Sequence, residues 1–142
     1  MKKSFLAVGL LVLWISLQGC VVVVDEEQRH SREPRRHLPA DGTIAEIDAV
    51  GKLVLDSHKR DGYERIAGRD NLGPEAQIHL VKAVFDNLAL ESSKENVLLT
   101  LIHNPSFCPA GERAILQRLD KLALESDKRN ILNAISERKN SG

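Results

Sequence analysis

The sequence predicts an all-α protein, and two observations carry this prediction. One template of Leu, any residue, Leu, acid, Ser, any residue and Lys occurs three times, beginning at Leu53, Leu88 and Leu122. The copies begin 35 and 34 residues apart, a period typical of repeated helical hairpins. We therefore expect residues 43–142 to form three stacked antiparallel helical hairpins, in a short right-handed α-α superhelix or bundle.

The chain opens with the layout of a secretory signal peptide. Residues 1–4 form a short basic start, and residues 5–15 are an apolar run of 11 residues. They are followed, after one residue, by Leu17, Gln18, Gly19 and Cys20. This run resembles the lipobox of bacterial lipoproteins. The resemblance implies that residues 1–19 are removed by cleavage between Gly19 and Cys20, and that the thiol of Cys20 carries the lipid.

An uncleaved membrane anchor is the alternative, because residues 5–24 are mostly apolar and long enough to span a bilayer. Both readings export the rest of the chain, since Lys2 and Lys3 hold the start on the cytoplasmic side. In bacterial lipoproteins an Asp after the lipidated Cys retains the protein in the inner membrane, and this chain has Val21 there. The resemblance thus implies a lipid-anchored protein of the cell envelope, in the outer membrane and facing the periplasm.

A flexible charged tether is expected over residues 20–42, after the lipidated Cys. Residues 25–42 carry both charge signs and two prolines, and they have no apolar face to bury. A coil of about 22 residues has a root-mean-square span of roughly 25 Å. This length carries a small domain clear of the lipid headgroups.

The second template copy belongs to the clearest hairpin. Its first helix is expected to begin at Pro74, because a first-turn position needs no backbone donor. Its second helix is expected to begin near Ser92, which forms a capping box with Glu95, and to end at Asn104. Helical spacing gives each helix one buried face, formed by Leu80, Val81, Val84, Phe85 and Leu88 in the first and by Val97, Leu98, Leu101 and Ile102 in the second.

The other copies keep this pattern with three informative departures. Gly62 occupies the position of Val97, which weakens the first hairpin by about 1 kcal/mol in helix propensity alone. Ser136 occupies the position of Ile102, as expected for a terminal repeat whose outer face meets water. The prolines that start the second and third hairpins are 35 residues apart, whereas the templates after them are 34 apart. The first helix of the third hairpin is therefore expected to be one residue shorter.

The two-helix unit and its period resemble tetratricopeptide repeats in shape, and HEAT repeats are a second match of this kind. The tetratricopeptide family places a bulky residue, Leu-Gly, Tyr and later Ala and Phe at set positions. This chain lacks the Leu-Gly pair and the Tyr there, and its one Trp, Trp14, lies in the signal segment. The resemblance therefore implies the fold alone, and no binding residue of the family is carried over.

The charged residues of the template recur as two rows that a partner could recognise. In a stack of repeats such rows form ladders along one edge, with steps of roughly 10 Å. The alternative is structural, because acids and Ser at a helix start satisfy free amides and complement the helix dipole. The two rows consist of Asp56, Glu91 and Glu125 and of Lys59, Lys94 and Lys128.

Composition and spacing argue against other classes of function. Removal of residues 1–19 leaves 18 basic and 20 acidic residues, a balance that argues against nucleic acid as a partner. None of the five histidines has a partner at metal-ligand spacing, so we expect neither a metal nor a cofactor. Cys108 near His103 suggests a nucleophile, but nothing supplies an orienting third group or an oxyanion site. With lipid on Cys20, Cys108 is an odd thiol that is either free or pairs between chains.

These features together predict a non-enzymatic, lipid-anchored module that faces the periplasm and holds a protein or peptide partner near the membrane. Small pilotin lipoproteins of secretion systems are similar in size and anchoring. The alternative is a structural or stress-related envelope lipoprotein without a defined ligand. A binding protein should expose an apolar patch of several hundred Å², whereas a structural protein should be polar throughout its surface.

Overall fold

The computed structural model describes residues 40–141, which form α-helices, one short 3-10 helix and the turns between them. No strand occurs in this range, so the predicted all-α class is confirmed. The helices are α2 (Ala40–Gly51), α3 (Asp56–Ala67), α4 (Pro74–Asn87), α5 (Glu91–His103), α6 (Pro109–Leu116) and α7 (Glu125–Asn140).

The expected signal segment, the lipobox with Cys20 and most of the expected tether lie outside the described residues. α2 begins at Ala40, three residues before the expected start of the domain. No helix within residues 40–141 is both long enough and apolar enough to cross a membrane.

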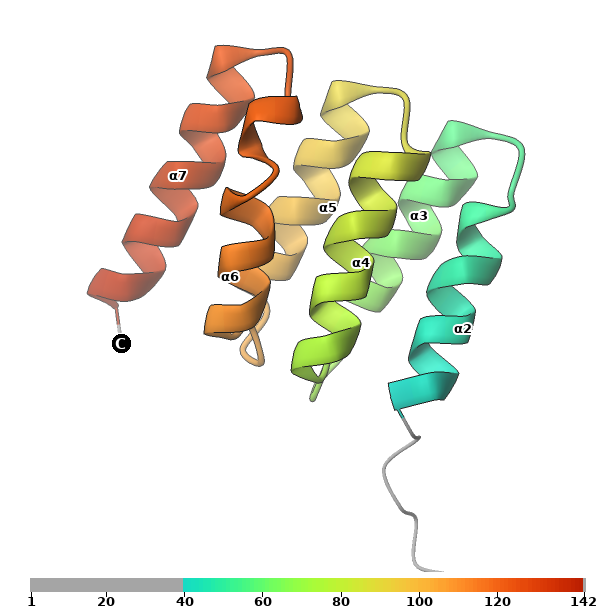
Figure 1. The fold of residues 1–142 in the computed structure, drawn as a ribbon. Coiled ribbons are helices and arrows are strands. Elements are labelled where there is room, and N and C mark those ends of the chain that lie inside the picture. Colours follow the sequence, from blue (N-terminus) through green and yellow to red (C-terminus); the bar gives the residue numbers. More distant parts are fainter. Residues whose placement is uncertain (1–39, 142) are drawn as a thin grey trace, which may run out of the picture. The chain divides into compact units, whose positions relative to one another are not determined.

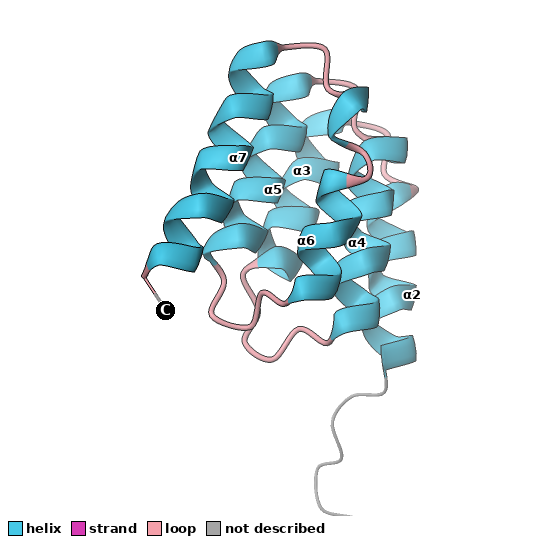
Figure 2. Ribbon diagram, turned by 60° about the vertical axis from the view of Figure 1, so that its left-hand side comes forward, coloured by secondary structure: helices cyan, strands magenta, loops and turns pink. Residues whose placement is uncertain are grey.

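The described helices lie in two layers, each formed by alternate helices along the chain (Figure 1). α2, α4 and α6 pack side by side in one layer, and α3, α5 and α7 form the other. Figure 2 shows the two layers next to each other, with α3, α5 and α7 on the left. We call the consecutive pairs α2–α3, α4–α5 and α6–α7 the first, second and third units. The predicted apolar faces of α4 and α5 are all buried and belong to one core.

The first helix of the third unit is broken rather than merely one residue shorter. α6 ends at Leu116 after 8 residues, whereas α4 has 14 residues. The chain then forms the 3-10 helix Leu119–Lys121. A 3-10 helix rises about 2.0 Å per residue, against about 1.5 Å in an α-helix, so fewer residues cover the same length. Leu122 is thereby buried like Leu88, which has the same template position.

The predicted capping box at the start of α5 is wrong. α5 begins at Glu91, and its N-cap is Leu90, which makes no side-chain capping bond. Ser92 is exposed within the first turn. The N-caps of α3 and α7 are likewise the second Leu of the template, Leu55 and Leu124. The polar residues that could cap these helices follow the N-cap position, so their side chains lie inside the first turn.

Gly62 lets the first two helices approach each other closely. It is buried in α3, and a Cβ at this position would lie 2.7 Å from Cγ1 of Val50 in α2. Real Cβ atoms do not approach other atoms closer than about 3.0 Å. The close packing of α3 on α2 therefore offsets the lower helix propensity of Gly62.

A buried amide joins the two turns that precede α4 and α6. Gln77 is fully buried, and its Nε2 donates to the carbonyl oxygens of Leu72 and Ser106, each at 2.7 Å. Its Oε1 accepts a hydrogen bond from the backbone N–H of Cys108 at 3.1 Å. Gln77 thus satisfies buried backbone groups in both turns, which fixes the second and third units against each other at this edge.

Candidate partner-binding surface

The template residues lie along one edge of the two layers, at the turns before α3, α5 and α7 (Figure 1). We call this edge, formed by residues 52–56, 88–91 and 122–125, the template edge. Asp56, Glu91 and Glu125 are the first residues of the three helices. Because these helices share one layer, the three acids come at equivalent places along the same edge.

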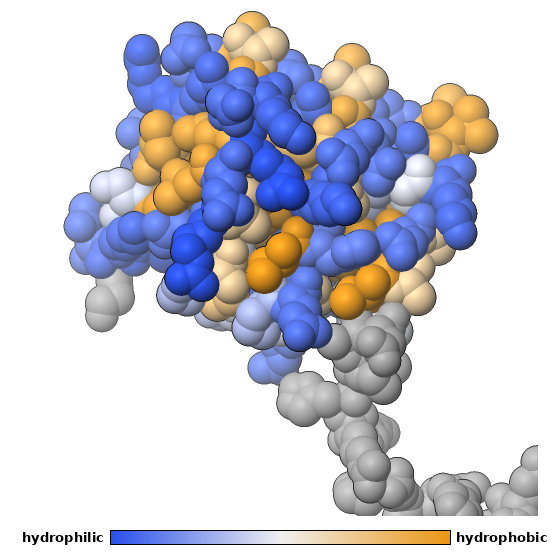
Figure 3. Space-filling model, viewed as in Figure 1, coloured by the Kyte–Doolittle hydropathy of each residue, from blue (hydrophilic) through white to orange (hydrophobic). Residues whose placement is uncertain are grey.

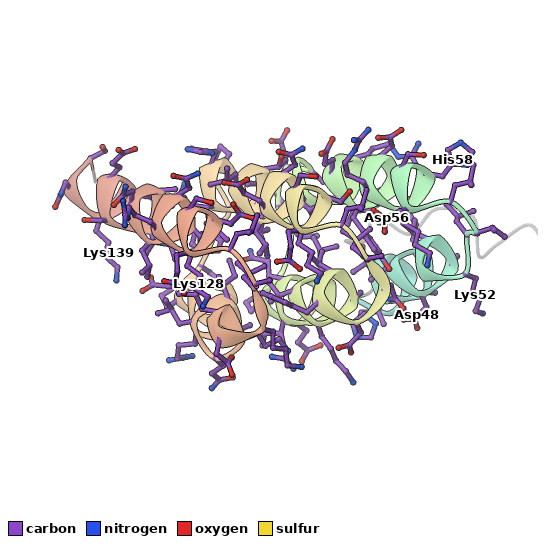
Figure 4. All side chains as sticks on the ribbon, turned by 90° about the horizontal axis from the view of Figure 1, so that it is seen from above. Asp48, Lys52, Asp56, His58, Lys128 and Lys139 are labelled. Atoms are coloured by element: carbon purple, nitrogen blue, oxygen red, sulfur yellow. The ribbon has the colours of Figure 1, made fainter. Side chains whose placement is uncertain are left out.

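Asp56 bonds to the second unit. Its Oδ1 accepts a hydrogen bond of 2.7 Å from the backbone N–H of Ala89, in the turn before α5. Figure 4, which looks down on the template edge, shows Asp56 at the start of α3, on the side of α5. Burial opposes ionisation, but the donors around the carboxylate, led by the N–H of Ala89, outweigh burial and lower its pKa. Asp56 is therefore a charged group in the joint between two units.

Glu91 repeats this joint between the second and third units. Its Oε2 accepts from the backbone N–H of Ala123 at 3.0 Å, and its Oε1 accepts from Nζ of Lys94 at 2.8 Å. The hydrogen bond from Lys94 lowers the pKa of Glu91 against the opposing effect of burial, and the N–H of Ala123 adds to the shift. We call this recurring contact between a template acid and the next template's backbone the acid–amide joint.

Glu125 has the same template position without the joint. Its side chain is 79% exposed, and no backbone N–H of a described residue donates to it. Nζ of Lys128 donates to its Oε1 at 2.6 Å, and this contact lowers the pKa of Glu125. Glu125 and Lys128 therefore form an ion pair on the exposed side of the last unit.

The other two template lysines are engaged within the domain. Lys59 donates from Nζ to the carbonyl oxygen of Asn87 at 3.1 Å, which links the first and second units. Lys94 is buried, with 9% of its surface exposed. The two predicted rows are therefore not a continuous polar surface, because contacts inside the domain already engage Asp56, Glu91, Lys59 and Lys94.

Aliphatic side chains are exposed along the template edge, which the sequence patterns did not mark as a site. The N-cap residues Leu55, Leu90 and Leu124 are 53%, 57% and 51% exposed, and Val54 is 93% exposed. Figure 3 shows hydrophobic surface at the tips of this edge. A signal was present in the sequence, because the second Leu of each template falls outside the apolar stripe of the helix that follows.

A second exposed apolar area belongs to the third unit. Leu116 of α6 and Leu132 of α7 are 41% and 45% exposed, whereas their counterparts in the second unit, Val81 and Leu98, are fully buried. Figure 3 shows hydrophobic surface where α6 and α7 lie in Figure 1. Ser136 of α7 is exposed as well. The third unit thus presents a face that the second unit buries.

The candidate metal ligands among the described residues are not gathered at one place. Among them, no three His, Cys, Asp or Glu side chains lie close enough to hold a metal ion. Cys108 is half-buried at the N-cap of α6 and has no disulfide partner in this range. Nδ1 of His103 donates to the carbonyl oxygen of Leu99 at 2.8 Å, so this ring is engaged within α5.

Comparison with known proteins finds no match: no protein-family model, no curated protein and no solved structure is significantly similar to this chain.

Proposed function

We propose that this protein is a lipid-anchored module that holds a protein or peptide partner near the membrane, on the periplasmic side. The anchor is expected at Cys20, and the helical domain carries the binding surface. The observation that supports the proposal is the set of half-exposed leucines along the template edge, Leu55, Leu90 and Leu124. Apolar side chains that are exposed together on one edge are unfavourable in water, and a partner that covers them gains this energy.

We further propose that the helices form a tetratricopeptide-like or HEAT-like stack of three hairpins with a right-handed superhelical twist. The two layers of alternate helices and the acid–amide joint at both unit boundaries support this arrangement. Stacks of this kind present extended surfaces that suit peptide binding. The proposed activity is binding without turnover, because the charged template residues are mainly engaged in contacts within the domain.

Leu90 and Leu124 allow a test that separates binding from folding. Both are exposed N-cap residues, and Ser is a better N-cap than Leu, so a Leu90→Ser, Leu124→Ser double variant should keep or raise the melting temperature. Crosslinking of the full chain in cells, followed by identification of the captured proteins, should lose the partner in this variant. The matched control is Ile78→Ser, which removes an aliphatic side chain of α4 that is 44% exposed and away from the template edge.

The control should still capture the partner. A double variant that folds and captures the same partner as the wild type would contradict this binding surface. An envelope protein without a defined ligand, which is the alternative function, would yield no specific partner in either the wild type or the variants.

The anchor is tested at Cys20. Mass analysis of the purified protein should find a diacylglyceryl-modified Cys20 as the first residue. Because anchoring raises the local concentration of a weak binder, Cys20→Ser behind a cleavable signal should release a domain that binds in solution and fails in the cell. Full cellular activity of this soluble form at native expression would contradict a role in holding a partner at the membrane.

A further inference from the structure

Neighbouring units of the domain are joined through the same pair of groups. In the acid–amide joint, the acid of one template copy accepts a hydrogen bond from the N–H of the middle residue of the next copy. Asp56 accepts from Ala89 at 2.7 Å, and Glu91 accepts from Ala123 at 3.0 Å. A third joint of this kind would need an available acid on one unit and an available N–H on another.

Both halves of a third joint are present at opposite ends of the domain. Glu125, the acid of the last copy, is 79% exposed at the side chain and accepts no backbone N–H from a described residue. Val54, the middle residue of the first copy, is 93% exposed, and its N–H donates to no described residue. A unit like the first one, placed after the third, would bring these two groups together.

Exposed apolar side chains accompany both halves. In the second unit, which is followed by another unit, Val81 and Leu98 are fully buried, whereas their counterparts Leu116 and Leu132 in the last unit are 41% and 45% exposed. At the first Leu of the template, the exposed copy lies in the first unit and not in the last. Leu53 is 42% exposed, whereas the same position is buried in the two copies that have a preceding unit. Each end of the domain therefore exposes apolar side chains whose counterparts are buried at the boundaries between units.

The charges at the two ends are also complementary. Across the second boundary, Nδ2 of Asn130 donates to Oε1 of Glu95 at 2.8 Å. The residue at the position of Glu95 in the last unit is Arg129, and the residue at the position of Asn130 in the first unit is Asp61. Both are exposed, and Asp61 also pairs with its neighbour Arg60 at 2.8 Å. A unit that follows the third with the same geometry would place Arg129 beside the Asp61 carboxylate.

We propose that a second copy of this chain docks head-to-tail, with its first unit against the third unit of the preceding copy. Glu125 of one copy then accepts from the Val54 N–H of the next, Arg129 faces Asp61, and Leu116 and Leu132 are covered. Such an interface joins two different surfaces, so it leads to an open row or a closed ring of copies and not to a symmetric dimer. This self-association goes beyond the proposed function and does not depend on the lipid at Cys20.

The test is crosslinking between two differently tagged full-length copies expressed in one cell. One copy carries Glu125→Cys and the other carries Val54→Cys, with Cys108→Ser in both and a short bismaleimide as the crosslinker. Head-to-tail docking predicts a crosslinked pair in the mixture and none when both copies carry the same added cysteine. A pair of copies without added cysteines measures the background from Cys20.

Charge reversal tests the geometry of the interface. Arg129→Glu in the copy with Glu125→Cys should lower the crosslinked yield about two- to fivefold, because an attractive exposed pair becomes a repulsive one. Asp61→Arg in the other copy should restore it. Lys82→Glu on the exposed side of α4 is the matched control and should leave the yield unchanged.

Three results would overturn the proposal. The first is the absence of a crosslink above background in the mixture. The second is an equal yield when both copies carry Glu125→Cys, which would indicate a symmetric dimer. The third is capture of a different protein at Glu125→Cys in place of the second copy, which would assign this end of the domain to another partner.

Discussion

Glu91 and Glu125 occupy the same template position and make different contacts. Glu91 holds the backbone of the next template and the ammonium group of Lys94, whereas Glu125 makes one exposed ion pair with Lys128. Both carboxyls have lowered pKa values, and in both the hydrogen bond from the nearby Lys is the main cause. The consequence for stability differs, because an exposed pair is screened by water and contributes little.

We expect Glu91→Gln to cost about 1–2 kcal/mol at neutral pH, because it weakens charged hydrogen bonds at a unit boundary. The folded state lowers the pKa of Glu91, so the stabilisation is present above the ordinary pKa of Glu and is lost as the pH falls through the lowered pKa. Denaturant unfolding at about pH 7 and about pH 3 should therefore show less pH dependence in Glu91→Gln than in the wild type. Glu125→Gln is the control, and equal losses in the two variants would contradict the acid–amide joint.

Gly62 is the second residue whose role depends on its neighbours. Ala has a higher helix propensity than Gly by about 1 kcal/mol, yet we expect Gly62→Ala to destabilise the domain by about 1–3 kcal/mol, because the added Cβ overlaps the stiff side chain of Val50. Thermal unfolding measures the effect. Gly68→Ala, where the nearest atom to the Cβ would be the carbonyl oxygen of Glu64 at 3.5 Å, is the control and should not destabilise the domain. A Gly62→Ala domain that melts above the wild type would contradict the close contact of α2 and α3.

At the scale of helices, the same apolar position is buried or exposed according to the neighbouring helix. α5 packs between α3 and α7, and Leu98 is fully buried, whereas α7 has α5 on one side and Leu132 is 45% exposed. We expect Leu98→Ala to cost about 2–5 kcal/mol as a buried truncation. Leu132→Ala should cost less than about 1 kcal/mol, because little area is lost from the core.

Chemical denaturation of both variants measures this difference. Similar losses for Leu98→Ala and Leu132→Ala would mean that another chain already covers α7 in solution. The comparison should therefore be made over a range of protein concentrations. If a second copy covers α7, the loss of unfolding free energy in Leu132→Ala depends on the protein concentration.

At the scale of the whole molecule, the helices of residues 40–141 form one compact unit. Their core is continuous from α2 to α7, so we expect a fragment of these residues to fold without the part of the chain that precedes it. Its far-ultraviolet circular dichroism spectrum should be that of a mainly helical protein, with one cooperative thermal transition. A spectrum without helix would contradict the autonomy of the domain. Two separated transitions would show that the third unit, with its broken first helix, unfolds on its own.

Local signals in the sequence predict the all-α class and the buried faces of α4 and α5, because helical periodicity acts within a single helix. The role of the template residues, in contrast, follows from contacts between units. The acid of one copy bonds to a backbone group 32 or 33 residues away, in the next unit. The close approach of Gly62 to Val50 and the exposure of Leu132 depend on neighbouring helices in the same way. A repeated sequence specifies which face of a helix is apolar, but the presence or absence of the next unit determines whether that face is covered.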